Sequence, residues 1–230
     1  MGRLTWWIGC VCVVLCLASA GRRVEAASLT VRTGKAEITA ATATGEGANV
    51  VEGKIESGRV VFGPLQTGDS LDVKLHLKDG RQVRLIDLSP PPSEGVGNGA
   101  TAALSDEDKS AIAGFLAEAK ATARQVRFVS INGDSKRAAA IVELVGDKSD
   151  AVPGGNDLLW RVELWRFEKA ATGWTRPDRL VRVLERERFD SVDKLKKKRT
   201  DTFFIGVPVG LRVEEDKNTQ MALPAMSAAK

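Results

Sequence analysis

Residues 158–189 read LLWRVELWRFEKAATGWTRPDRLVRVLERERF, and this stretch decides the fold expected for the second half of the chain. Its tryptophans fall within fifteen residues and are Trp160, Trp165 and Trp174. If this stretch is a strand, its side chains alternate between two faces. The apolar residues would lie on one face up to Leu164 and on the other face from Trp165. A local bulge or strong bend can produce such a change. Residues 171–173 are turn-like and β-branched residues follow them, so we expect a hairpin rather than a helix.

The three tryptophans allow two interpretations. In the first, they pack against a helix that begins near Ser105, and the opposite, charged side of the hairpin faces water. In the second, they form an exposed aromatic shelf that binds a sugar or a peptide, so that the candidate ligand-binding residues are Trp160, Trp165 and Trp174. Large aromatic side chains dominate small cores, and we therefore favour the first interpretation.

Residues 101–215 are expected to form an α+β domain in which one helix packs on a bent antiparallel sheet. Ser105 followed by Asp108 predicts a capping box at the start of the helix. Apolar residues then recur at helical spacing and form one stripe: Ile112, Phe115, Leu116, Ala119 and Ala123. Strands are expected at 126–131, 137–145, 158–168, 179–189 and 202–213. Residues 216–230 are expected to be a disordered tail.

Residues 28–88 are expected to form an all-β domain. In LDVKLHL (residues 71–77) apolar and polar residues alternate, as in a strand with one buried face. Asp79-Gly80 follows and favours a two-residue hairpin, because positive φ is needed at its tip. Residues 89–99 then read SPPPSEGVGNG, and this composition predicts an interdomain linker over residues 89–100.

The first domain resembles the carboxypeptidase regulatory-like domains, which are prealbumin-like β-sandwiches. The resemblance rests on a strand, a Leu-x-x-Gly turn and a strand of alternating hydrophobics, here Val61, Phe62, Leu65, Gly68, Leu71 and Val73. It implies a sandwich fold and a mostly non-catalytic, accessory role.

The second domain is similar to cystatin-like and nuclear-transport-factor-like cone folds. The strand pair before WRVELWRFE and the Gly173-Trp174 pair after the final turn carry this similarity. The whole chain also looks like uncharacterised exported proteins of planctomycete-type bacteria, a resemblance that implies no activity.

Residues 1–26 have the three-part pattern of a secretory signal peptide. A basic start and an apolar run, Leu4 to Leu17, are followed by small residues, so cleavage is expected after Ala20 or Ala26. Retention as an anchor is the alternative, because Arg22-Arg23 follows the apolar run. All three cysteines lie inside the apolar run, so the cleaved chain would contain none and would be held by its hydrophobic core alone.

The charge balance argues against nucleic acid as a partner. Cleavage after Ala26 removes three arginines and one glutamate, so the net charge falls from +4 to +2. Nucleic-acid binders show a dense, one-sided basic excess. The densest basic run, Lys194 to Arg199, is interpreted as a solvated loop, with contact to an anionic surface as the alternative.

Few residues offer catalytic or metal chemistry. His76 is the one histidine, and it lies on the polar face of a strand beside Lys74 and Lys78, where surface decoration is the simpler interpretation. A histidine-based triad or a thiolate metal site would need residues that the mature chain lacks. No catalytic residue, metal site or cofactor is therefore predicted.

The sequence predicts an exported, non-enzymatic, two-domain protein of the periplasm or cell surface that acts in binding or envelope assembly. The expected partner is another envelope protein or a cell-wall glycan or peptide, with membrane contact only through an uncleaved N-terminal segment. The alternative is a small-molecule or glycan binder that uses the cone of the second domain, or, less favoured, a hydrolytic enzyme that uses carboxylates there.

Overall fold

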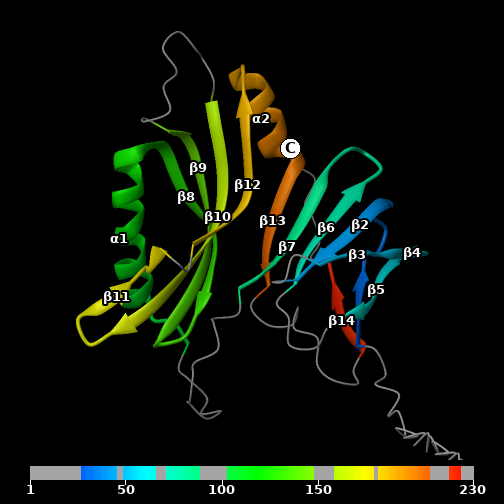
Figure 1. Cartoon of the computed structure of the whole chain (residues 1–230), viewed down its shortest axis with the longest axis horizontal. Coiled ribbons are helices and arrows are strands. Elements are labelled where there is room, and N and C mark those ends of the chain that lie inside the picture. Colours follow the sequence, from blue (N-terminus) through cyan, green and yellow to red (C-terminus); the bar gives the residue numbers. More distant parts are fainter. Residues whose placement is uncertain are drawn as a thin grey trace, which may run out of the picture.

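The computed structural model describes residues 27–45, 49–65, 71–88, 103–147, 158–178, 181–207 and 218–223. The predicted signal peptide (1–26) and linker (89–100) lie outside these described residues. The chain is mostly β-sheet, with two helices among the described residues, and Figure 1 shows its two parts side by side.

One part is a sandwich of two sheets. The first sheet has the strand order β14-β1-β5-β4, with β1 at Ala27–Arg32, β4 at Lys54–Glu56, β5 at Arg59–Leu65 and β14 at Asn218–Ala222. The second has the order β13-β7-β6-β2-β3, with β2 at Ile38–Thr44, β3 at Val50–Glu52, β6 at Asp72–Leu77, β7 at Gln82–Asp87 and β13 at Thr202–Val207. We call this part the sandwich half.

The core of the sandwich half follows the predicted alternation. Val73, Leu75 and Leu77 point inward from β6, while the residues between them are partly exposed. The hairpin after β6 is longer than predicted, because Leu77 N–H donates to Arg81 O (2.8 Å) around a three-residue tip. Gly80 has φ +88° there, a conformation that suits glycine and explains the residue at this position.

The other part is a helix on a curved antiparallel sheet, and we call it the inserted half (103–201). Helix α1 spans Asp106–Thr122 and begins at the predicted cap, where Ser105 Oγ accepts from the Asp108 N–H (3.1 Å). The strands are β8 (Ala123–Gly133), β9 (Arg137–Asp147), β10 (Leu158–Ala170), β11 (Gly173–Thr175) and β12 (Val181–Phe189). Strand β10 is central, pairing with β9 on one side and with β11 and β12 on the other.

Both faces of β10 are buried, which corrects the expectation that the charged side of the hairpin faces water. Trp160 and Leu164 belong to one hydrophobic cluster, and Trp165 and Phe167 belong to another on the opposite face. The register with β9 is continuous, and the register with β12 shifts between Val162 and Glu163 rather than at Leu164–Trp165. A strand that is buried on both faces carries apolar residues on both. The sequence pattern at Leu164–Trp165 therefore reflects burial of both faces and not a change of the buried face.

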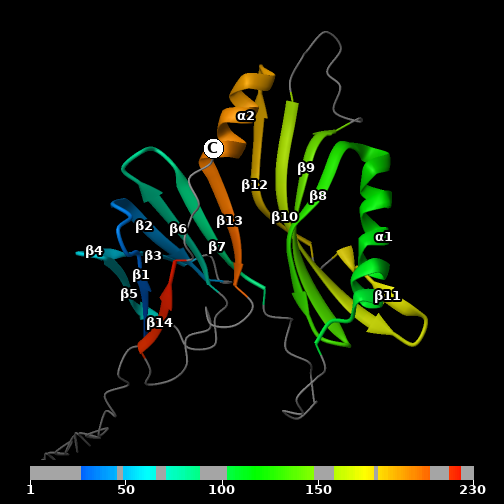
Figure 2. The same ribbon diagram turned by 180° about the vertical axis from the view of Figure 1, so that it is seen from behind.

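The predicted loop at Lys194–Arg199 is wrong, because this run is part of helix α2, Val192–Asp201. Helix α2 covers the face of the inserted sheet opposite α1, as Figure 2 shows from behind. Its one buried residue, Leu195, joins the cluster of Trp160 and Phe189.

The C-terminal part of the chain returns to the sandwich half, which corrects two predicted boundaries. Strand β13 pairs in parallel with β7, although its residues were assigned to the second domain (101–215). Strand β14 pairs in parallel with β1, although residues 216–230 were expected to be disordered. The sandwich half is therefore discontinuous in sequence, and residues 103–201 are inserted between β7 and β13.

The two halves are packed together rather than joined only by a linker. Ile86 and Leu88 from the sandwich half lie in the same hydrophobic cluster as Trp160. Across the same junction Arg84 pairs with Glu185 (2.9 Å), and a second pair joins Arg182 to Asp72 (2.9 Å).

Candidate functional site

All three candidate tryptophans are core residues. Trp160 and Trp165 are each 1% exposed, and Trp174 is 9% exposed. Each indole N–H donates to a buried carboxylate: Trp160 to Glu143 (2.8 Å), Trp165 to Glu163 (2.7 Å) and Trp174 to Asp108 (2.8 Å). A buried indole N–H usually has such a partner, so these contacts account for the positions of the rings without a ligand.

Glu143 is the most heavily bonded of these carboxylates. It also accepts from Arg199 of α2 (2.8 and 2.9 Å) and from Arg127 of β8. Burial raises its pKa, but the hydrogen bonds from Arg199, Trp160 and Arg127 outweigh burial and hold the pKa below its usual value. The carboxylate therefore ties α2 to the inserted sheet.

The Asp108 carboxylate ties α1 to the inserted sheet. Its carboxylate accepts from Lys169 Nζ (2.6 Å), Trp174 Nε1 and Ser105 Oγ (2.8 Å). These hydrogen bonds, led by the one from Lys169, hold the pKa of Asp108 well below its usual value. The first-turn acid that the sequence predicts for helix capping thus also locks the helix to β10 and β11.

Trp165 borders a cavity of about 470 Å³, which we call the α1 pocket. The pocket lies between Glu118 and Thr122 of α1 and Arg161 and Glu163 of β10. The Arg176 guanidinium lies 4.2 Å from the centroid of the Trp165 ring. Because the chain's own arginine covers the ring face, Trp165 is not the open shelf that the second interpretation requires.

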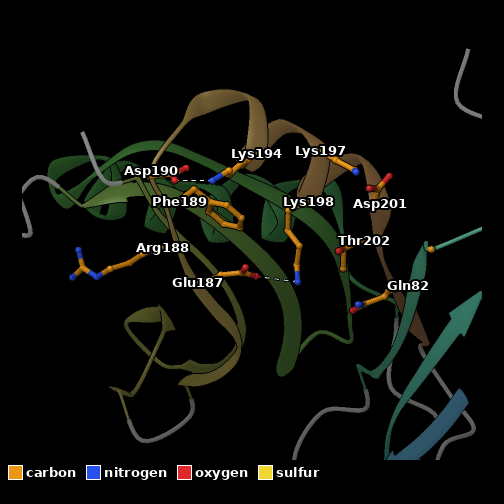
Figure 3. A pocket seen from close by; sticks show the side chains of 11 residues that line it. Gln82, Glu187, Arg188, Phe189, Asp190, Lys194, Lys197, Lys198, Asp201 and Thr202 are labelled. Carbon is orange, nitrogen blue, oxygen red and sulfur yellow. Dashed lines mark hydrogen bonds and ion pairs between the residues drawn. The ribbon is translucent and has the colours of Figure 1, made fainter. Parts of the chain in front are cut away.

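A second cavity, of about 560 Å³, lies where the two halves meet, and we call it the junction pocket. The hairpin between β6 and β7 contributes Gly80 and Gln82, and the end of β12 contributes 187–190. The remaining lining residues come from α2 and the start of β13 and are Lys194, Lys197, Lys198, Asp201 and Thr202. In Figure 3 the ring of Phe189 lies beside Asp190, Lys194 and Lys198, and Arg188 points away. The other labelled side chains lie together on the far side of Lys198 and are Lys197, Asp201, Thr202 and Gln82.

Local capping explains why a lysine-rich run forms α2 beside this pocket. Ser191 is the N-cap and accepts from the Lys194 N–H (3.3 Å). Asp193 lies in the first turn, and Lys198 and Arg199 lie in the last turn, an arrangement that the helix dipole favours. The helix thereby presents a row of ammonium groups to the junction pocket.

The charges in the junction pocket are only partly compensated. Lys194 pairs with Asp190 (2.6 Å) and Lys198 with Glu187 (3.0 Å), as the dashed lines in Figure 3 mark. The hydrogen bond from Lys194 lowers the pKa of Asp190. Beneath the pocket, Phe189 packs edge-on against Trp160, with their ring centroids 6.4 Å apart.

Sequence reasoning singled out the residues beneath the pocket but missed the pocket itself. Gln82 lies more than a hundred residues from Lys197 and Asp201 in the sequence, and no local pattern links it to them. The signal that could have predicted α2 is Ser191, a preferred N-cap residue, followed two positions later by Asp193.

His76 is half-buried on β6, where it is the register partner of Gln82, and it does not line the junction pocket. Its pKa is lowered, first by burial and then by the charges of Lys74, Lys198 and Arg84. Within the described ranges no group of three histidine, cysteine or acidic residues could hold a metal ion. Nor does that part of the chain contain a helix long and apolar enough to cross a membrane.

The chain matches no protein-family model, no curated protein and no solved structure.

Proposed function

We propose that the chain is an exported, non-enzymatic binding protein and that the junction pocket is its ligand site. The observation that carries the proposal is the assembly of this pocket from both halves of the molecule, with Gln82 on one side and α2 on the other. Ligand sites prefer interfaces between folded units and measure about 300–1,000 Å³. The volume of about 560 Å³ falls within this range.

The side chains that line the pocket support binding rather than catalysis. The ring of Phe189 supplies an apolar surface, and charged groups and the Gln82 amide line the same pocket. Ligand sites commonly combine apolar surface with a few polar groups that orient the ligand. Nucleophilic catalysis would need a nucleophile within hydrogen-bond reach of an activating base. Among the described lining residues Thr202 carries the one hydroxyl group, and no hydrogen bond joins it to a lysine or a carboxylate that could activate it.

Calorimetric titration of the chain from Ala27 onward tests the proposal. The compounds are small peptides, amino sugars, sugar phosphates and neutral sugars. We expect at least one charged compound to bind saturably and Lys197→Ala to weaken it. The matched control is Lys196→Ala, since Lys196 is exposed on the same helix but does not line the pocket. Absence of binding by every compound, or equal weakening by both variants, would refute the proposal.

A second candidate function is binding in the α1 pocket, as the resemblance to cone folds suggests. The observation in its favour is that Trp165 lines this pocket together with Glu163 and Arg176. Binding that survives Lys197→Ala but is lost in Arg176→Ala would support it over the junction pocket.

Export is checked by the mass of the chain recovered from outside the cytoplasm. The proposal expects the loss of residues 1–20 or 1–26, whereas an intact, membrane-bound chain would indicate the anchored alternative.

A further inference from the structure

Two oppositely charged side chains of the junction pocket remain available to a ligand. Lys194 and Lys198 are engaged by Asp190 and Glu187, but Lys197 and Asp201 form no side-chain ion pair or hydrogen bond with any residue that the structure describes. Figure 3 shows Lys197 and Asp201 next to each other along α2, without a bond between them. The nearby cation Arg81 is already paired with Asp79 (2.6 Å).

A third polar group in the pocket also lacks a partner. The Oε1 atom of Gln82 is buried and accepts no hydrogen bond within the described part of the chain. A buried acceptor without a donor costs free energy, which a ligand N–H or O–H would recover when the Gln82 side chain turns its amide towards the pocket. In Figure 3 Gln82 lies beside Thr202, below Asp201.

The available groups divide by chemistry. Asp201 and Gln82 Oε1 both accept hydrogen bonds, and together they suit an ammonium group, which has three donors and no acceptor. Lys197 donates and suits a carboxylate. The Phe189 ring, 7% exposed, lines the same pocket and offers an apolar contact.

Resting on the proposed function, we infer that the ligand of the junction pocket is a zwitterion of dipeptide size, a short peptide with free amino and carboxyl ends. Lys197 and Asp201 are four residues apart on α2, which corresponds to about 6 Å along the helix axis. Two residues of extended chain span about 7 Å, so a dipeptide places its terminal charges about as far apart as these two helix positions. The two charges of a single amino acid are closer together than that.

The test is a titration of the chain from Ala27 onward with four matched compounds. These are alanyl-leucine, its N-acetyl form, its C-terminal amide, and free leucine. We expect alanyl-leucine to bind best and each blocked form to bind about tenfold more weakly, the effect of losing one charge-assisted hydrogen bond. Free leucine should also bind more weakly, because its charges do not span Lys197 and Asp201.

Two variants assign each end of the peptide to its partner. In Asp201→Asn, N-acetylation should change the affinity by less than about twofold, because the negative charge opposite the ammonium is gone and only neutral acceptors remain. In Lys197→Gln, C-terminal amidation should lose its effect in the same way. Lys196→Gln is the matched control and should keep the full discrimination. Circular dichroism confirms folding, and Asn at the C-terminal end of α2 does not oppose the helix dipole.

The outcomes separate this inference from the proposed function. If N-acetyl-alanyl-leucine or a sugar phosphate binds as tightly as the free dipeptide, the zwitterion is wrong while the pocket remains a binding site. If Asp201→Asn keeps the full effect of N-acetylation, the assignment of the ammonium to Asp201 is also wrong. If no compound of either panel binds, both proposals fail.

Discussion

At the scale of single residues, three tryptophan–carboxylate pairs organise the inserted half. Charged acceptors are costly to bury, so each carboxylate needs further donors to offset the loss of hydration. Glu143 and Asp108 have them in Arg199 and Lys169. The pairs therefore specify where α1 and α2 sit, besides filling the core.

Replacing Glu143 with alanine should lower the free energy of unfolding by about 2–4 kcal/mol, because the Trp160 N–H and the Arg199 guanidinium lose their acceptor. Glu143→Gln keeps an acceptor for the indole and should cost less. Urea unfolding followed by tryptophan fluorescence measures both values. A loss below about 1 kcal/mol for Glu143→Ala would show that the pair has no structural role.

The Asp108 carboxylate predicts a pH dependence of stability. Its pKa in the folded state lies below the ordinary value of 3.8, so its stabilising effect is present above pH 3.8 and is lost as the pH falls below that value. Asp108→Asn should therefore be clearly less stable than the wild type at pH 6, and the difference should shrink towards pH 2.5. Thermal unfolding at both pH values measures it, and a difference that grows on acidification would contradict the assignment.

Burial of the tryptophans was predictable from the sequence, whereas their partners were not. Size and hydrophobicity place Trp160 and Trp165 in a core wherever they fall in the chain. Glu143 lies on a neighbouring strand and Asp108 on a helix, so the pairing depends on a register and a packing angle that the local sequence does not encode.

At the scale of elements, strands β13 and β14 complete the sandwich from the far end of the chain. Phe203, Ile205 and Met221 pack against its core, and Val207 is part of it. A fully buried side chain of this kind contributes about 1.5–3 kcal/mol. Phe203, Ile205 and Met221 are partly buried and contribute less each, but the four together are a large share of the stability of a typical domain, about 5–15 kcal/mol.

Ending the chain after Asp201 should therefore abolish cooperative unfolding of the sandwich half. A chain that ends after Leu223 keeps both strands and serves as the control. Far-UV circular dichroism during urea titration distinguishes the two. A shortened chain with the stability of the control would mean that the returning strands are dispensable.

Gly206 marks a close approach between β13 and β8. A Cβ atom there would collide with the Leu88 side chain and lie 2.6 Å from Ser130 Oγ. Gly206→Ala should cost about 1–3 kcal/mol, as overpacked cores do. Gly114 in α1 has open space around it, and Gly114→Ala should instead stabilise by about 0.5–1 kcal/mol. Opposite signs of the two effects in urea unfolding are the expected result, and equal signs would contradict the packing.

The sequence predicted most strands but neither helix α2 nor the parallel pairings of β13 and β14. The alternation in β6 and the Ser105 cap of α1 are local signals, and the structure shows both. Helix α2 has a single buried residue, so its sequence contains no apolar stripe that would predict a helix. The parallel pairings of β13 and β14 join residues more than a hundred positions apart, and only the folded sandwich can specify them.

At the scale of the whole molecule, insertion of one folded part into another creates the junction pocket. The inserted half leaves the sandwich after β7 and re-enters it at β13, next to β7 in the same sheet. Helix α2 ends where β13 begins, beside the start of β7 (Figure 1). Its lysines therefore line the same pocket as Gly80 and Gln82. The pocket thus depends on both halves being folded and docked.

The central claim is that ligand binds in the junction pocket, and the three tryptophan indole N–H signals of the ¹⁵N-labelled chain from Ala27 onward test it most directly. Trp160 lies beneath this pocket, 5.9 Å from Lys198 Nζ to its ring centroid, whereas Trp165 borders the α1 pocket. We expect the tightest-binding compound to shift the Trp160 signal and to leave those of Trp165 and Trp174 in place. A shift of the Trp165 signal alone would move the site to the α1 pocket and contradict the account.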